Sequence, residues 1–479
     1  MIHESTTDLR NALGTAGIQL DGAKARVTDA QRLRKDGIDD LIRTAVFSSD
    51  EATRDLAREV IHRVARATGA VPASIQPLYE AIGRRELEPT FTVPAHNLRA
   101  MTYEKARALF RAAMRHDVGA FVFEIARSEI GYTEQRPAEY AAAVLAAAVK
   151  EGFQGPVFIQ GDHFQASMKR WSGPERETER KAIESLIDEA IDAEFYNIDI
   201  DTSTLVDLSF PTLDEQQKLN YEGCAHFTRY IREREPKGIE ISIGGEIGEV
   251  GKTNTSPEEF RAYMDGYNRL LGDGMKGISK VSIQTGTSHG GVPLPDGTIA
   301  TVKLDFGTIR TISKISRDEY GVAGAVQHGA STLPEEVFDE FPKSDAIEIH
   351  LATGFQNMLY DHPAFPKDLK REIEEWLRTN AADERREKET EEQFLYKTRK
   401  KAIGPFKRRM WDLPEETRKP IMDDLQRKFE FLMEKLGVFG TREIVSRYVP
   451  TDANSERPAG RLRKEKLDMA ALVVEGEGE

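Results

Sequence analysis

The feature that most constrains the fold is a series of eight short apolar runs between residues 91 and 365. Helical patterns such as "YEKARALFRAAMRH", "ETERKAIESLIDEAIDA" and "SPEEFRAYMDGYNRLL" separate many of these runs. The runs are "TFTVPA", "AFVFEIA", "PVFIQGD", "FYNIDID", "EISIGGEI", "KVSIQTG", "GAVQHG" and "AIEIHLA". Eight strands that each lead into a helix or helix-like connection predict an α/β fold, the (β/α)8 TIM barrel. The alternative is an open doubly wound sheet, which usually has fewer strands and a glycine-rich loop after the first one.

The flanking segments have a different character. Residues 1–90 and 366–451 are charged and mostly helix-patterned, so we expect N-terminal and C-terminal helical extensions around a barrel over 91–365. Residues 452–479 are predicted to be a mobile tail. The basic stretch 397–411 is expected to form a solvated or interface helix, with contact to a second phosphate as the alternative.

The charge balance limits the partners. Lys and Arg number 67 against 81 Asp and Glu, which gives a net charge of −14 and argues against nucleic acid. One cysteine, Cys224, rules out an internal disulfide and favours a reducing compartment. No segment approaches the roughly 20 apolar residues of a membrane helix, and the first residues lack a signal-peptide pattern. These features predict a soluble cytoplasmic protein without a membrane partner.

Polar side chains follow the predicted strands at their C-terminal ends, which meet at the mouth of a barrel. They are Asp162 and His163, then Asp199, Asp201 and Ser203, then Glu246, His289 and His328, and finally His350 and Thr353. Three imidazoles from three strands would suit a divalent ion with an open position, most simply zinc. Asp162 would then lie beside the ion, available for proton transfer. The plainer interpretation is that each histidine is a hydrogen-bonded loop residue.

Glycines accompany two of these histidines, in "SHGG" (288–291) and "HGAS" (328–331). Backbone N–H groups at such turns bind phosphate without a positive side chain, which agrees with the acidic net charge. The alternative is that these glycines only make tight turns.

Taken together, these segments resemble the class II, metal-dependent fructose- and tagatose-bisphosphate aldolases over roughly 91–360. The resemblance is carried by "VPAHN", "GDH", "IDIDTS", "GGEIGEVGK", "GTSHG", "LDFGTIRTIS" and "QHGAS", in this order. The set of "GDH", "GEIG", "GTSHG" and "HGAS" is fairly specific, whereas any one of them alone is weak.

The resemblance implies an aldolase that cleaves and forms a carbon–carbon bond in a phosphorylated ketose, with one catalytic zinc ion. It leaves open a monovalent cation, and we expect a homo-oligomer. It implies His163, His289 and His328 as zinc ligands, with Glu246 and Asp201 near the metal. Asp162 would be the acid/base. The implied contacts to substrate or its phosphate are Gly290, Gly329, Ser331 and Thr353, with Asn97 and Ser128 as further candidates.

The sequence also departs from the family pattern. Gln160 stands where the family has a second histidine, and "HLATG" replaces an Asn-x-Asp-Thr-Asp segment, so that His350 and Ala352 are unusual. The normally acidic loop after the fifth strand leaves Glu249 as a catalytic candidate. Two alternatives therefore stay open: a metal-dependent enzyme or epimerase for another sugar phosphate, and a non-catalytic aldolase-like subunit.

Overall fold

The computed structural model describes residues 1–248, 253–286, 304–452 and 472. Eight parallel strands form a closed barrel, because each pairs with the next one along the chain and the last pairs with the first. The strands are β4 (Val93–Asn97), β5 (Val122–Ala126), β6 (Gly155–Gln165), β7 (Asn197–Asp201), β8 (Ser242–Glu246), β9 (Lys280–Ser282), β10 (Ala325–Gln327) and β11 (Glu348–Leu351). The predicted TIM barrel is thus confirmed, and each predicted apolar run overlaps one barrel strand, with β4 and β6 extending beyond their runs.

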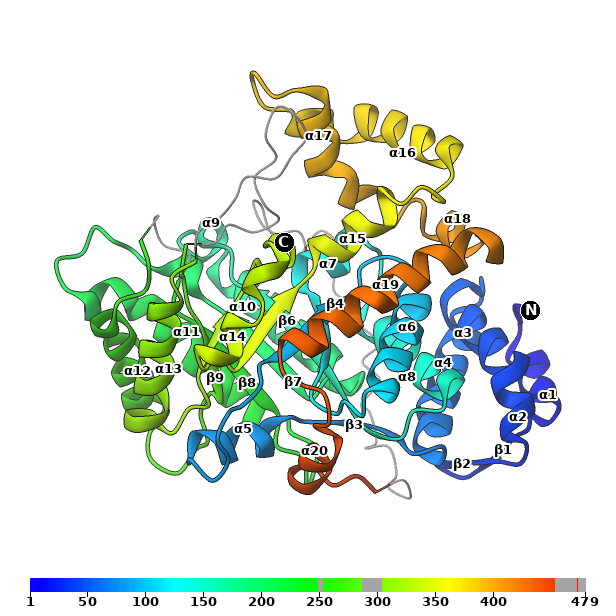
Figure 1. Ribbon diagram of the computed structural model, residues 1–479, viewed down its shortest axis with the longest axis horizontal. Coiled ribbons are helices and arrows are strands. Elements are labelled where there is room, and N and C mark those ends of the chain that lie inside the picture. Colours follow the sequence, from blue (N-terminus) through cyan, green and yellow to red (C-terminus); the bar gives the residue numbers. More distant parts are fainter. Residues whose placement is uncertain (249–252, 287–303, 453–471, 473–479) are drawn as a thin grey trace.

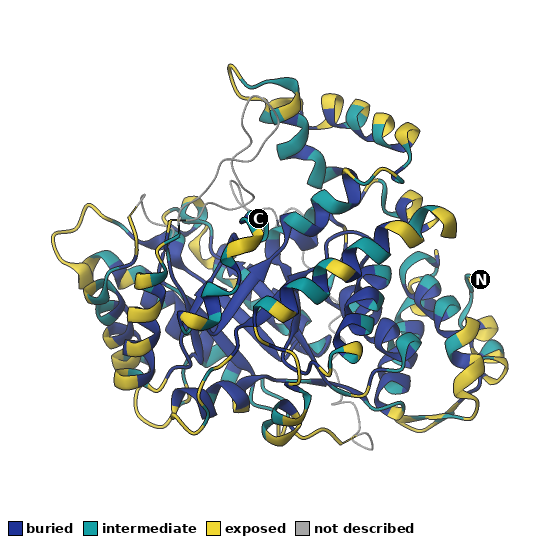
Figure 2. Ribbon diagram, in the orientation of Figure 1, coloured by how far each residue is buried: buried dark blue, intermediate teal, exposed yellow. Residues whose placement is uncertain are grey.

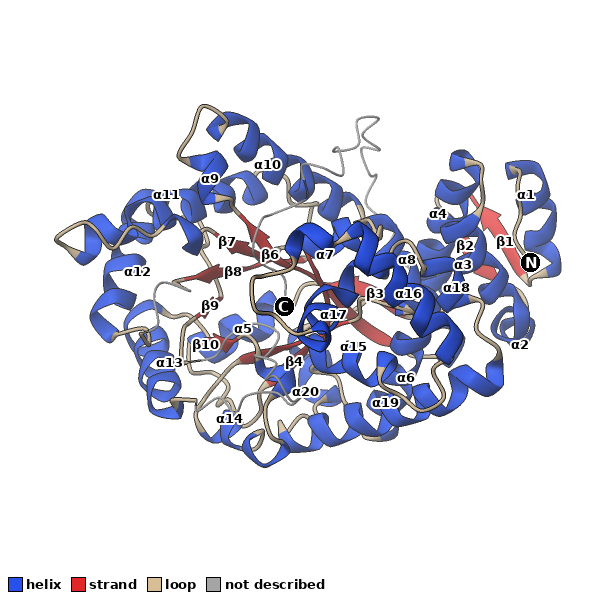
Figure 3. Cartoon of the chain, turned by 90° about the horizontal axis from the view of Figure 1, so that it is seen from above, coloured by secondary structure: helices blue, strands red, loops and turns tan. Residues whose placement is uncertain are grey.

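Amphipathic helices surround the barrel (Figures 1 and 3). In α6 the buried residues Ala106, Leu109, Phe110 and Ala113 recur at three- and four-residue spacing, so one helix face lies against the strands. The helices between consecutive strands are α6 (Thr102–Arg115), α7 (Arg127–Tyr132), α8 (Pro137–Glu151), α9 (Met168–Trp171), α10 (Arg176–Asp192), α11 (Leu213–Arg232), α12 (Pro257–Leu271), α13 (Phe306–Tyr320) and the short α14 (Glu340–Lys343). Figure 2 shows the strands buried and the outer faces of these helices exposed.

The C-terminal segment supplies part of this outer layer. Its helices are α15 (Thr353–Tyr360), α16 (Lys367–Asn380), α17 (Glu391–Thr398), α18 (Lys407–Trp411), α19 (Glu415–Lys435) and α20 (Arg442–Tyr448). Helix α19 packs against α6 and α15, and its Phe429 contacts the rings of His96 and Phe355. It therefore covers the barrel beside β4, whereas α16 and α17 stand above the mouth (Figure 1).

The N-terminal segment contains strands as well as the expected helices. It comprises α1 (Thr6–Thr15), β1 (Ile18–Asp21), β2 (Lys24–Val27), α2 (Ala30–Arg32), α3 (Ile38–Phe47), α4 (Glu51–Ala67), β3 (Ala70–Ala73) and α5 (Gln76–Gly83). Strand β3 runs parallel to the first residues of β6, and the amide of Ile75 donates to the side chain of Asn197 at 2.9 Å. Helix α5 closes the N-terminal end of the barrel, where the hydroxyl of Tyr79 donates to Glu348.

The basic stretch 397–411 makes ion pairs with acids of the same chain. The pairs are Lys397–Glu389, Arg399–Asp361, Lys401–Glu384, Lys407–Glu139, Arg408–Asp412 and Arg409–Glu372. Most of this charge is therefore used within the fold. A separate property of the described residues is that none of their helices combines the length and apolar character needed to cross a membrane.

Candidate active site

Asp162 and His163 lie within β6, at an irregularity of the strand, and not after its end as the sequence suggested. The pairing with β7 shifts register between Gly161 and Phe164. His163 has a positive φ of 40°, which is rare for a residue with a side chain. Bulges of this kind turn a side chain toward a functional site, and strain of this kind clusters there. The strand continues because Phe164 and Gln165 pair again with β7 beyond the bulge.

The ring of His163 is oriented by two carboxylates. Its Nδ1 lies 3.2 Å from Oδ2 of Asp201 and 3.2 Å from Oε2 of Glu246. Asp201 is itself fixed, because its Oδ1 accepts from the Ser203 hydroxyl at 2.7 Å and its Oδ2 from the Gln165 amide at 2.6 Å. The other ring nitrogen, Nε2, faces His328.

His328 presents its Nδ1 to Nε2 of His163, so two imidazole nitrogens from β6 and β10 converge. The opposite nitrogen of His328 is held by the Ser282 hydroxyl at 2.7 Å, which fixes the ring orientation as partners of metal ligands commonly do. Ligand atoms of His163, His328 and Glu246 all lie within 4.8 Å of one another. Burial lowers the pKa of His163, but Asp162 and Glu246 outweigh this and raise it well above its usual value. The donor types and the negative potential both suit a divalent cation.

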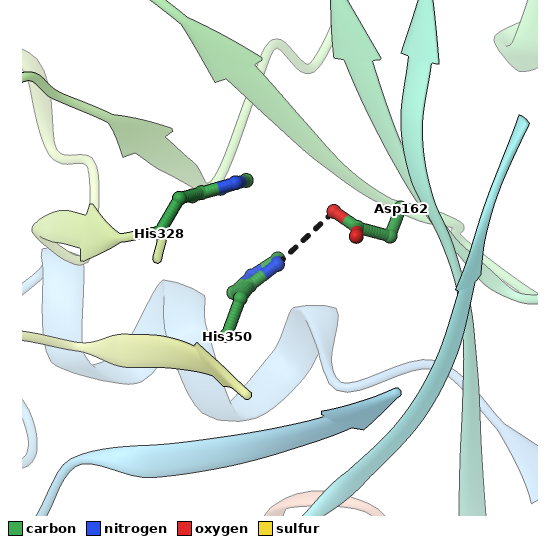
Figure 4. A group of neighbouring side chains, drawn as sticks. All are labelled: Asp162, His328 and His350. Atoms are coloured by element: carbon green, nitrogen blue, oxygen red, sulfur yellow. Dashed lines mark hydrogen bonds and ion pairs between the residues drawn. The ribbon is translucent and has the colours of Figure 1, made fainter. Parts of the chain in front are cut away.

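Asp162 lies beside this pair of imidazoles and is almost completely buried. Its Oδ1 is 3.0 Å from Nδ1 of His350 and 3.7 Å from Nε2 of His163. Figure 4 shows Asp162 facing the ring of His350, which lies nearly parallel to that of His328 with 4.1 Å between centroids. Burial alone would raise the pKa of Asp162, but the two histidines and Lys280 lower it to about 2. The carboxylate is therefore ionised at neutral pH and can accept a proton.

Below Asp162 the barrel interior holds a buried charged network, whose Lys280 and Glu348 were not singled out from the sequence. Lys280 donates to Asp199 at 2.9 Å, to Gln160 at 2.8 Å and to Glu348. Burial opposes the charge on Lys280, yet Asp199 and Glu348 raise its pKa above the usual value. The sequence carried one sign of this network, because each apolar run contains a polar residue. A buried charged side chain needs a partner, so such residues on different strands are expected to meet inside the barrel.

Several of the predicted phosphate contacts meet at the ends of β10 and β11. Gly329 adopts a left-handed conformation with φ of 66° and begins a short 3₁₀ turn. The Ser331 hydroxyl accepts from the backbone N–H of Gly354 at 3.1 Å, and Thr353 is the first residue of α15. Loops after the seventh and eighth strands form the phosphate site in many TIM barrels. The structure adds Arg99, which lies 3.5 Å from the Thr353 hydroxyl and was not singled out from the sequence.

The remaining candidates lie at the ends of neighbouring strands. Asn97 is the last residue of β4, where its amide donates to Glu129, and its Oδ1 has no hydrogen-bond partner among the described residues. Ser128 is half-buried in the first turn of α7 (Arg127–Tyr132), directly after β5. Three other predicted site residues, Glu249, His289 and Gly290, fall outside the described part of the chain.

Comparison with known proteins identifies the family. The model of the family "Fructose-bisphosphate aldolase class-II" matches residues 83–415. Among solved structures, the chain is similar to the YdjI aldolase of Escherichia coli K12, with 13% identity and a TM-score of 0.44. That match covers 78% of this chain and 100% of the other. The match to a fructose-bisphosphate aldolase of Campylobacter jejuni has 15% identity, a TM-score of 0.45 and coverage of 78% and 97%.

A search of curated proteins gives no significant match. The family match spans more than half of the sequence, and the chain belongs to the class II fructose-bisphosphate aldolase family. Its fold is the TIM barrel of that family, and family membership supports a lyase of the aldolase type.

Proposed function

We propose that this protein is a zinc-dependent aldolase that cleaves and forms a carbon–carbon bond in a phosphorylated ketose. The observation that carries the proposal is the convergence of His163, His328 and Glu246 at the barrel mouth, with the ionised carboxylate of Asp162 beside them. An imidazole–carboxylate donor set with room for further ligands is typical of catalytic zinc.

Two imidazoles and a carboxylate whose ligand atoms lie within 4.8 Å of one another are donor types that a divalent ion takes. His163 and His328 would hold it, with Glu246 as a third donor in reach, and His289 stays a predicted ligand. Asp201 lies behind His163 and hydrogen-bonds Nδ1, so its proposed role is to orient the ring and increase its basicity. When bound, the ion supplies Lewis-acid stabilisation of the negative charge that develops on the ketone oxygen.

Asp162 is the proposed acid/base. In the cleavage direction its carboxylate accepts the proton of the hydroxyl on the departing carbon, while the electrons of the broken bond pass to the carbon next to the ketone. In the synthesis direction it returns that proton to the new hydroxyl. The carboxylate is ionised and almost fully buried, so it can take up a proton from a bound hydroxyl at a place with little access for bulk water.

The substrate phosphate would be held at the ends of β10 and β11, by backbone N–H groups near Gly329 and by the hydroxyls of Ser331 and Thr353. The guanidinium of Arg99 lies next to Thr353, and its Nε is paired with Glu129 at 2.7 Å. Local binding of this kind is required, because the net charge of −14 repels an anionic ligand at long range.

A second candidate is a metal-dependent enzyme of the same scaffold that acts on another sugar phosphate. The observation that favours it is His350, whose Nδ1 is occupied by Asp162 and whose ring lies under His328. A side chain held in this way is not free to contact substrate as the family's asparagine would be.

A panel of ketose mono- and bisphosphates tests both candidates. Protein loaded with zinc should cleave at least one compound, lose this activity with a chelator and regain it when zinc is restored. His328→Ala should lower the bound metal and the activity together, whereas His226→Ala on α11, which pairs with Glu184 far from the mouth, should change neither. Metal-loaded protein that cleaves none of the panel would reject the aldolase, and isomerised products would favour the second candidate.

A further inference from the structure

We infer that His350 is a positioning residue that fixes the carboxylate of Asp162 for proton transfer, and that it is anchored by the buried network inside the barrel. This inference rests on the proposed function of Asp162. It concerns a residue that departs from the family pattern, so the device belongs to this chain.

The geometry places the imidazole of His350 between two carboxylates. Nδ1 lies 3.0 Å from Oδ1 of Asp162, and Nε2 lies 2.7 Å from Oε1 of Glu348. The ring is fully buried and stacks on His328 at 4.1 Å between centroids. It can neither flip nor slide without breaking one of these contacts.

Glu348 is a rigid anchor because donors from four parts of the barrel converge on it. Its Oε1 accepts from Nζ of Lys280, from the Gln160 amide at 3.1 Å and from His350, and its Oε2 accepts from the hydroxyl of Tyr79. The carboxylate has no exposed surface. Side chains locked by such a surrounding shell hold a catalytic group most accurately.

Two further carboxylates compete for the ring nitrogens. Nε2 of His350 lies 3.7 Å from Oδ2 of Asp199, and Nδ1, the nitrogen that faces Asp162, also lies 3.1 Å from Oε2 of Glu124. That oxygen already accepts from the Gln160 amide at 3.1 Å, so its capacity is partly used. The bond to Asp162 is the one that leads toward the barrel mouth, where the chemistry is proposed.

It follows that the side chain at position 350 must place a hydrogen-bond donor where Nδ1 of His350 lies. A small displacement of a catalytic group can cost about 100-fold in rate. A donor at the place of Nδ1 should preserve the orientation of Asp162, whereas a donor only at the place of Nε2 should not. Asparagine can put its amide nitrogen near the first place and glutamine near the second, which gives a matched pair of variants.

The test compares His350→Asn with His350→Gln in zinc-loaded protein, with metal content measured for both. We expect His350→Asn to keep kcat within about threefold of the wild type, and His350→Gln to lose about 10- to 100-fold, a range set by the cost of misplacement. KM and bound zinc should stay unchanged in both. Equal losses in the two variants, or a change in KM with kcat unchanged, would overturn the inference and indicate a substrate contact.

Crystal structures of the two variants give a readout that needs no activity. The Asp162 carboxylate should keep its wild-type position in His350→Asn and turn away in His350→Gln, and the same position in both would contradict the inference. If the wild type cleaves no ketose phosphate, the proposed function fails, yet these structures still decide whether His350 positions Asp162. Tyr79→Phe serves as a second probe that leaves the mouth intact, and an unchanged kcat there would remove Tyr79 from the anchor.

Discussion

Asp162 is flanked by the imidazoles of His163 and His350, at 3.7 and 3.0 Å, and is almost completely buried in the barrel. Burial would favour the neutral acid, but the neighbouring positive groups reverse this and keep the carboxylate ionised. At the scale of single residues, the acid/base character of the site therefore depends on its immediate charged neighbours.

Asp162→Asn tests this residue directly. Because the amide cannot accept the hydroxyl proton, we expect kcat to fall by about 10²- to 10⁴-fold. Bound metal should be retained, since Asp162 is not among the residues proposed to hold it. Asp207→Asn, in the loop after β7, is the control and should be neutral. Turnover close to the wild type in Asp162→Asn would reject its role.

Lys105 differs from Asp162, because this buried side chain contacts a backbone carbonyl and, among the described residues, no group of opposite charge. It is 1% exposed, and its Nζ has one backbone carbonyl, that of Phe355, at 3.4 Å. Burial, assisted by the nearby Arg99, lowers its pKa to about 7. In the unfolded chain the Lys105 amine keeps its proton up to its usual pKa of 10.5. Between pH 7 and about pH 10.5 the unfolded state therefore binds more protons than the folded state, and the free energy of unfolding of the wild type should rise with pH.

Lys105→Met removes this cost while preserving the side-chain volume. We expect the free energy of unfolding at pH 7 to increase by up to about 4 kcal/mol, since each pKa unit corresponds to about 1.4 kcal/mol. The gain should vanish toward pH 10.5. Urea denaturation at both pH values measures it, with the exposed Lys181→Met as the control. A loss of stability at pH 7 would mean that the ammonium group is stabilised in the folded state.

At the scale of elements, helix α19 packs on the barrel although 63 residues lie between the end of β11 at Leu351 and its own start at Glu415. It covers the side of the barrel next to β4, where Phe429 closes an aromatic cluster with His96 and Phe355. His96 is buried in this cluster, and burial lowers its pKa to about 3, so it stays neutral. The C-terminal helices thus contribute to the core as well as to the surface.

Phe429→Ala measures this contribution. Removing a fully buried ring should lower the free energy of unfolding by about 3–5 kcal/mol. Phe431→Ala, on a partly buried face of the same helix, should cost less. Chemical denaturation of both variants provides the comparison. Equal small effects would show that α19 is only loosely attached.

At the scale of the whole molecule, one buried ion pair joins the N-terminal segment to the barrel. Glu194, between α10 and β7, accepts from Arg66 and contacts His62, both on α4. Burial would raise the pKa of Glu194, but His62 and Arg66 lower it well below its usual value of 4.5. The resulting stability is fully present above pH 4.5 and is lost as the pH falls through the lowered pKa.

Glu194→Gln should therefore destabilise the protein by roughly 3–5 kcal/mol at neutral pH, because it leaves buried positive groups without their counter-charge. The difference from the wild type should shrink as the pH falls below 4.5. Urea denaturation between pH 7 and pH 3 tests this, and Glu233→Gln on the surface is the control. A difference that does not change with pH would assign the effect to packing.

The sequence alone determined the barrel, because eight apolar runs alternating with amphipathic helices leave few other ways to bury so many strands. It also predicted that Asp162, His163 and His328 lie close together, because parallel strands bring these positions to the same end of a barrel. Only the tertiary structure revealed the bulge at His163, the strand β3 added to β6, and α19 as an outer helix of the barrel. It alone joined Glu348, Lys280 and Tyr79 beneath His350. These features depend on contacts between residues far apart in the chain, and local periodicity carries no information about which distant partner a buried charge or a helix face will meet.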